Sequence, residues 1–217
     1  MTQSEENYLK IIYHLSLVSI TEISTNAIAE KMETKASSVT DMLKKLAEKE
    51  LVDYQKYQGV LLTAKGLLTA KMIVRKHRLW EVFLVEKLHF AWDEVHEIAE
   101  ELEHIKSDKL VDKLDEFLEF PSKDPHGDPI PDKNGRILKI EKQLLSDLEI
   151  GEKGICIGVK DSSSSFLQYL DKQKIALGSK ITVVEKEPFD NSITIEINEF
   201  KLLISSKIAN NLFVRKE

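Results

Sequence analysis

Apolar residues recur at helical spacing along the first fifty positions of the chain. Residues 4–17 carry them three and four positions apart, which predicts an amphipathic helix. Residues 25–32 fit a second, shorter helix. Residues 36–50 fit a third, with Val39, Met42, Leu43 and Leu46 facing inward. Two short helices joined by a tight turn predict a helix-turn-helix unit.

Short runs of β-forming residues follow in residues 51–63 and flank the pair Gln58-Gly59. Such a pair between two β-type runs predicts a hairpin. A hairpin placed directly after the third helix makes this unit a winged helix.

The middle of the chain returns to helical spacing. Residues 63–86 predict one long helix, and residues 93–104 predict an acidic one. A third helix is expected over residues 107–120, with one apolar stripe formed by Leu110, Val111, Leu114, Phe117 and Leu118. Because this stripe exceeds what a small winged helix can cover, we expect it to form a homodimer interface.

Proline and glycine then interrupt the pattern, and short β-type runs follow from about residue 148, with one helical segment among them. This pattern of short β-type runs predicts a small β-barrel. The expected fold class is α+β. The expected domains are a winged helix-turn-helix DNA-binding domain (1–63), a helical metal-binding and dimerisation domain (64–122), a proline-containing linker (123–147) and the barrel (148–217).

Charge is distributed unevenly along the chain, although the net charge is only −6. From Lys35 to Arg78 there are ten basic against four acidic residues, a balance of +6, and from Glu81 to Phe120 there are four against thirteen, a balance of −9. A basic block suits phosphate and an acidic block suits a metal cation. The polar first residues, the single Cys156 and the lack of a long apolar run predict a cytoplasmic protein with no membrane partner.

The start of the third helix is the expected DNA-reading edge, because a recognition helix offers its N-terminal residues to the bases. The candidates are Lys35, Ser37, Ser38, Thr40 and Lys44, with Lys56 on the wing for a phosphate. No arginine, asparagine or glutamine is placed for a bidentate base contact, so we expect readout of DNA shape. Each lysine is equally compatible with a solvated surface charge.

The acidic segment from Asp93 to His104 contains six acids, two histidines and no lysine or arginine. Its residues His96, Glu100, Glu103 and His104 share one helical face. Carboxylates stacked at this spacing repel one another, and a divalent cation bound by carboxylate and imidazole would relieve the repulsion. A solvated acidic face with two unrelated histidines is the alternative.

Five stretches together resemble the diphtheria-toxin-repressor family of iron- and manganese-dependent repressors. They are E-N-Y-L-K-I-I-Y, A-S-S-V-T-D-M-L-K-K-L, R-K-H-R-L-W-E, V-H-E-I-A-E-E-L-E-H and H-G-D-P-I-P. The resemblance covers the whole chain and implies that the C-terminal barrel is FeoA-like. It further implies a homodimer that binds double-stranded operator DNA when Mn²⁺ or Fe²⁺ is bound, with Zn²⁺, Co²⁺ or Cd²⁺ as substitutes in vitro.

By this resemblance, a primary metal site would use Glu100, Glu103 and His104 together with Asn7 of the first helix. Asn7 stands where iron-type members often have methionine and manganese-type members aspartate, and it could bind through its carbonyl oxygen. Glu100 replaces the cysteine of iron-type members, which favours manganese. Lys10 replaces the glutamate that supports a paired-ion site in short manganese regulators, so we do not expect such a pair.

The resemblance leaves two ligand sets open for a second site. One consists of His77, Glu81, His96 and Asp161. The other consists of Glu81, Asp124, His126 and Asp161.

The predicted function is therefore a metal-dependent repressor that controls genes of metal uptake and homeostasis, and not an enzyme. One alternative is a ferritin-like or other helical metalloenzyme, because Glu101 and His104 fit a Glu-x-x-His motif. That architecture needs a second such motif, which the sequence lacks. The other alternative is a winged-helix protein that binds DNA independently of metal.

Overall fold

The computed structural model describes residues 1–19 and 21–217. The chain forms two compact units, each drawn from several stretches of sequence. The first contains residues 1–80, 99–116 and 131–137, and the second contains residues 81–98, 117–130 and 138–217. Residues 64–122, expected to be one helical domain, are therefore shared between the two units.

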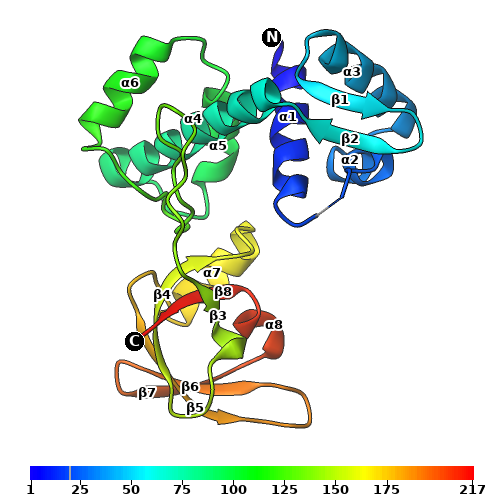
Figure 1. The fold of residues 1–217 in the computed structure, drawn as a ribbon. Helices are drawn as coiled ribbons and strands as arrows, with labels where there is room; N and C mark the ends of the chain where they lie inside the picture. The colour runs from blue at the N-terminus through cyan, green and yellow to red at the C-terminus, as the bar shows by residue number, and fades with distance from the viewer. Residues whose placement is uncertain (20) are drawn as a thin grey trace. The chain divides into compact units, whose positions relative to one another are not determined.

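A winged helix begins the first unit (Figure 1). Its helices are α1 (Gln3–Ser16), α2 (Thr25–Lys31) and α3 (Ala36–Glu48), and its wing is the antiparallel pair β1 (Val52–Gln55) and β2 (Gly59–Leu62). This arrangement confirms the predicted helix-turn-helix and hairpin. The side chain of Thr2 caps α1 and that of Ser24 caps α2, since each accepts a hydrogen bond from a backbone N–H of the first turn.

Apolar side chains from all these elements form one core. Leu9 and Ile12 of α1 pack there with Val39, Leu43 and Leu46 of α3, and all five are fully buried. The inward positions expected from periodicity on α3 are thus confirmed. This core fixes α1, which carries several of the candidate site residues.

The long helix α4 (Ala64–Leu88) starts against the winged helix. A Cβ at Gly66 would lie 1.8 Å from the carbonyl oxygen of Leu51, so only glycine permits this close approach. Two shorter helices follow, α5 (Val95–Leu102) and α6 (Asp108–Phe117). No helix within residues 1–19 and 21–217 is both long and apolar enough to span a membrane.

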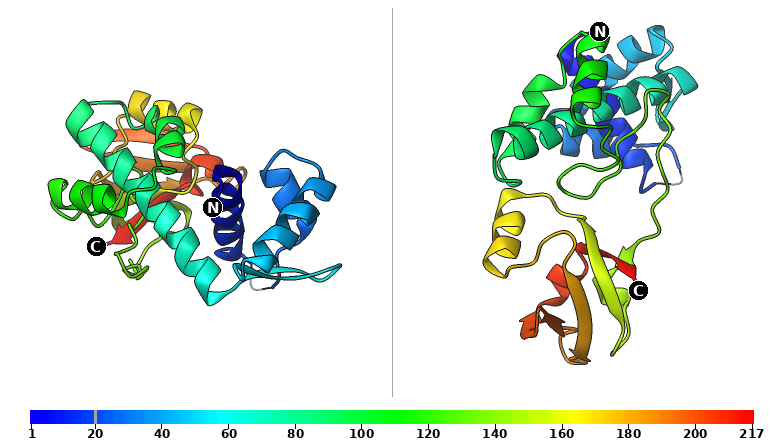
Figure 2. Two further views of the ribbon diagram at one scale, coloured as in Figure 1. Left: turned by 90° about the horizontal axis from the view of Figure 1, so that it is seen from above. Right: turned by 90° about the vertical axis from the view of Figure 1, so that its left-hand side faces the viewer.

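The second unit contains a six-stranded antiparallel sheet, as expected for the C-terminal part (Figure 2). The strand order is β3-β8-β4-β5-β6-β7, with two helices beside the strands. The bounds are β3 (Gln143–Leu144), β4 (Lys153–Val159), α7 (Ser164–Lys172), β5 (Lys180–Lys186), β6 (Ile193–Ile197), β7 (Phe200–Ile204), α8 (Ser206–Ala209) and β8 (Leu212–Lys216), with a single 3-10 turn at Leu145–Asp147. Cys156 lies in its core, and burial raises the pKa of this thiol to about 11, so it is an unreactive strand residue.

Candidate functional site

Residues 99–104, the end of the acidic segment, belong to the first unit and contact α1 and α4 there. Glu103 follows the last residue of α5 and continues its hydrogen-bonding pattern, with its N–H donating to the carbonyl of Ala99. Its side chain has no exposed surface, whereas Glu100 is partly exposed. A fully buried carboxylate needs charged or polar partners, so the neighbours of Glu103 define the site.

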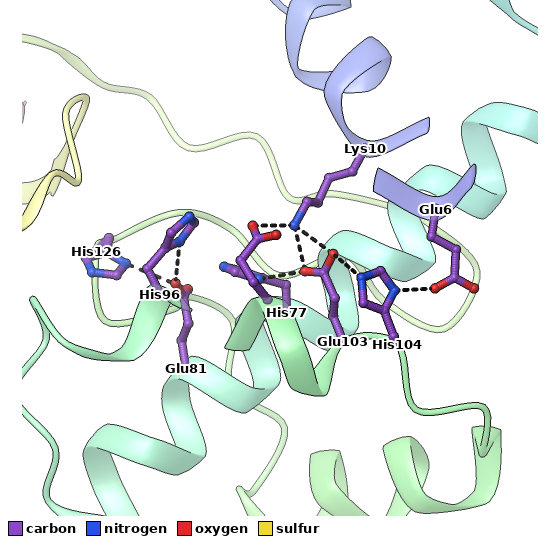
Figure 3. A network of polar contacts seen from close by, with 9 residues as sticks. Glu6, Lys10, His77, Glu81, His96, Glu103, His104 and His126 are labelled. Carbon is purple, nitrogen blue, oxygen red and sulfur yellow. Dashed lines mark hydrogen bonds and ion pairs between the residues drawn. The ribbon is translucent and has the colours of Figure 1, made fainter. Parts of the chain in front are cut away.

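Lys10 of α1 supplies one of these partners (Figure 3). Its Nζ lies 2.5 Å from Glu100 Oε1 and 2.7 Å from Glu103 Oε1. Burial by itself would raise the pKa of Glu103, but hydrogen bonding to His77 and the charge of Lys10 lower it below its usual value. Sequence reasoning considered Lys10 only as an obstacle to a paired-ion site and missed this contact.

His77 of α4 is a second partner, because its Nδ1 lies 2.7 Å from Glu103 Oε2. His77, Glu100 and Glu103 each place a possible ligand atom within 4.8 Å of the others. The structure therefore brings His77 to the predicted primary ligands. One predicted ligand set grouped His77 with Glu81 and His96, and that grouping stays a prediction.

His104 completes this cluster and has a partner that the sequence did not reveal. Its Nδ1 lies 2.6 Å from Glu6 Oε2, and its Nε2 lies 3.9 Å from Glu103 Oε1 (Figure 3). A carboxylate on one ring nitrogen orients the other nitrogen toward a ligand position. Glu6 looked like an ordinary acid of a helix's first turn, although its spacing of four from Lys10 puts both on one face of α1.

Asn7 lies on α1, between Glu6 and Lys10 in the sequence. Within the part of the chain that the structure describes, its Oδ1 is buried and has no hydrogen-bond partner. A buried polar atom of this kind calls for an explanation, and a bound cation would provide one. The chemistry of Asn7 therefore fits the predicted role of a hard, neutral metal ligand.

A second cluster lies within the second unit and consists of Glu81, Asp124 and His126. All three are buried, and their possible ligand atoms lie within 4.8 Å of one another. His126 Nε2 lies 2.8 Å from the carbonyl oxygen of Trp92 and donates to it, so Nδ1 faces Glu81 Oε2 at 3.7 Å. Although burial lowers the pKa of His126, the hydrogen bond and charge of Glu81 and the charge of Asp124 raise it to about 8.

The remaining candidates for a second site are His96 and Asp161. His96 Nδ1 is 3.4 Å from Glu81 Oε1, but the imidazole is about half exposed. Among the residues that the structure describes, Asp161 is in no group of three ligand-type side chains, and its carboxylate accepts a hydrogen bond from the N–H of Ser163. The geometry thus groups Glu81 with Asp124 and His126, and Asp161 as a ligand stays a prediction.

The loop that carries Asp124 and His126 is held against β4. The carbonyl of His126 accepts a hydrogen bond from the N–H of Val159. Gly127 has φ +90°, and a Cβ there would lie 2.1 Å from the carbonyl oxygen of Ile157. The Trp92 ring stacks on His126 and donates from Nε1 to Asp171 of α7 at 3.0 Å. The sheet and α7 therefore fix the position of this cluster.

Most of the residues expected to contact DNA are exposed on the winged helix. Exposed side chains at the start of α3 and on the wing are those of Lys35, Ser37, Ser38, Lys44 and Lys56. Thr40 is half-buried and donates its hydroxyl to the carbonyl of Ala36. Lys56 lies over the Tyr57 ring, 4.9 Å from its centre, at the tip of the wing.

Three family models match the chain in succession. They are the iron dependent repressor N-terminal DNA binding domain over residues 1–60, the iron dependent repressor metal binding and dimerisation domain over residues 63–132, and the FeoA domain over residues 143–216.

Similar proteins carry related descriptions. An HTH-type transcriptional regulator of Methanocaldococcus jannaschii is 40% identical over 119 residues, which are 55% of this chain and 95% of that protein. The HTH-type transcriptional regulator MntR of Oceanobacillus iheyensis is 31% identical over 152 residues, which are 70% of this chain and 96% of that protein. A solved manganese-dependent transcriptional repressor in complex with manganese is 35% identical, with a TM-score of 0.88 over 98% of this chain and 100% of that one.

Proposed function

The chain belongs to the iron-dependent repressor family of metal-dependent transcriptional repressors, and on this premise we propose that it binds operator DNA as a homodimer when loaded with Mn²⁺ or Fe²⁺. We propose further that it acts in the cytoplasm and controls genes of metal uptake and homeostasis. The family consists of repressors and not enzymes, so the Glu101-x-x-His104 motif does not make this chain a metalloenzyme.

The observation that carries the proposal is that His77, Glu100 and Glu103 bring their possible ligand atoms together. The two carboxylates of this group also contact Lys10 of α1, the first helix of the winged helix. These donors fit a borderline divalent cation, since carboxylate and imidazole ligands suit manganese, iron, cobalt and zinc. The unsatisfied Oδ1 of Asn7 supports the same conclusion. We assign Asn7, His77, Glu100, Glu103 and His104 to one site, and Glu81, Asp124 and His126 to a second site.

A cation at the first site would be held jointly by donors from α1, from α4 and from the end of α5. Asn7 lies on the same helix as Leu9 and Ile12, whose side chains lie in the core of the winged helix. Linking α1 to the α5 segment would therefore restrict the positions that the DNA-binding helices adopt. Metal and DNA would then strengthen each other's binding by the same factor, typically about 1–3 kcal/mol.

The experiment is operator binding by the metal-free protein and by the protein with Mn²⁺, Fe²⁺ or Zn²⁺ added separately. We expect weak binding without metal and at least about tenfold tighter binding with the physiological ion. Equal binding in all four conditions would instead support a winged-helix protein that ignores metal.

A further inference from the structure

Lys10 is a buried cation at the centre of the first site. Its side chain is 9% exposed, and its Nζ bonds the carboxylates of both Glu100 and Glu103 (Figure 3). Lysine is almost never this buried unless it is paired. The ammonium therefore neutralises part of the charge that the acidic segment brings together.

The same carboxylates are proposed metal ligands, so two cations would compete for them. Glu103 Oε2 already accepts hydrogen bonds from Lys10 Nζ and His77 Nδ1, each at 2.7 Å. A divalent ion sharing these oxygens with an ammonium would face strong repulsion, because charges a few ångströms apart interact strongly away from water. Either the ammonium leaves or the ion binds more weakly.

We propose that Lys10 is an internal competitor of the metal, resting on the proposed function of this site. Its ammonium occupies the carboxylate pair of the metal-free protein and is displaced when the ion binds. It thereby lowers metal affinity and raises the metal concentration at which the repressor responds. It also stabilises the metal-free first unit by joining α1 to the α5 segment.

Lys49 provides a control, because it forms an ion pair with a carboxylate of α1 away from the metal site. Its Nζ lies 2.6 Å from Glu5 Oε1, and Glu5 is as buried as Glu6. This lysine–glutamate pair contains none of the assigned ligands. Removing it tests the loss of an ion pair to α1 without changing the charge at the metal site.

The test is calorimetric titration of the full-length protein with Mn²⁺, combined with thermal unfolding of the metal-free protein. Glu103→Gln identifies the binding event that belongs to this site. We expect Lys10→Met to lower the dissociation constant of that event about tenfold or more and to lower the unfolding temperature without metal. Lys49→Met should leave the dissociation constant unchanged.

Lys10→Gln serves if Lys10→Met does not fold, because its amide can still donate to one carboxylate without carrying charge. Unchanged or weaker Mn²⁺ binding in a folded Lys10 variant overturns the proposal about Lys10 alone. If Glu103→Gln removes no binding event, the proposed metal site itself fails, and the competitor role fails with it.

Discussion

Glu6 and His104 are 98 positions apart in the chain, yet Glu6 Oε2 lies 2.6 Å from His104 Nδ1, with both side chains buried. The contact joins the first turn of α1 to the last residue of the acidic segment. In the proposed site, Glu6 is therefore the partner of an assigned ligand. Such partners fix the orientation of an imidazole and raise its basicity.

Replacing Glu6 should therefore weaken metal binding although Glu6 is not an assigned ligand. We expect Glu6→Gln to raise the Mn²⁺ dissociation constant about 10–100-fold with the fold retained, as measured by calorimetry. Glu5→Gln is the control, because Glu5 bonds Thr2 and Lys49. Equal effects of the two changes would show that Glu6 matters only for helix stability.

Removing the central carboxylate should uncouple DNA binding from metal. We expect Glu103→Gln to lose metal-stimulated operator binding, since Glu103 contacts both Lys10 and His77. The measurement is DNA binding with and without Mn²⁺, after circular dichroism confirms a folded protein. A folded variant with the wild-type metal response would remove Glu103 from the site.

Adding charge at Asn7 should have the opposite effect. The buried Oδ1 of Asn7 becomes one oxygen of a carboxylate in Asn7→Asp, which is a stronger ligand for a hard cation. We expect tighter Mn²⁺ binding by calorimetry and lower thermal stability without metal, because a further buried negative charge is then uncompensated. Asn7→Met should instead favour Fe²⁺ over Mn²⁺, and no change in either variant would exclude Asn7 as a ligand.

The apolar stripe of α6 contains both buried and exposed side chains. Leu114 is 6% exposed and packs within the chain, whereas Phe117 is 60% exposed. We expect Phe117→Glu to give a folded monomer by light scattering, because the exposed ring is available to a second copy. Leu114→Glu should unfold the protein, since it buries an unpaired charge. A Phe117→Glu dimer with normal stability would place the interface elsewhere.

The second cluster predicts a pH dependence of the metal-free protein. The pKa of His126 is raised from 6.5 to about 8, so its charged form stabilises the folded state. This stabilisation, about 2 kcal/mol, is fully present below pH 6.5 and is lost as pH rises through about 8. Chemical unfolding across this range should show the loss, and His126→Gln should abolish it. With saturating Mn²⁺ the trend should reverse, because the metal requires a neutral imidazole.

Local patterns in the sequence were enough for the elements but not for the contacts between them. Periodicity identified α3 and its buried Val39, because a helix face follows from spacing alone. The same rule places His77 and Glu81 one turn apart on α4. The rule cannot indicate that Glu103, from another segment, lies 2.7 Å from His77.

Lys10 illustrates the same limit for charge. A lysine on a helix is ordinarily solvated, and nothing within α1 indicates burial of this one. Its burial follows from packing against Glu100 and Glu103, which are 90 and 93 positions away. The excess of acids from Asp93 to His104 was a visible signal that a cation was needed, and the structure provides an internal one.

The stacking of Trp92 on His126 gives the protein an intrinsic optical reporter. The ring centres are 6.1 Å apart, and the indole N–H is bonded to Asp171. Protonation or ligation of that imidazole changes the surroundings of a fluorophore, and the chain has only two tryptophans. Emission from Trp92, isolated by replacing Trp80 with phenylalanine, can therefore follow occupancy of the proposed second site separately from the proposed first, without any attached label.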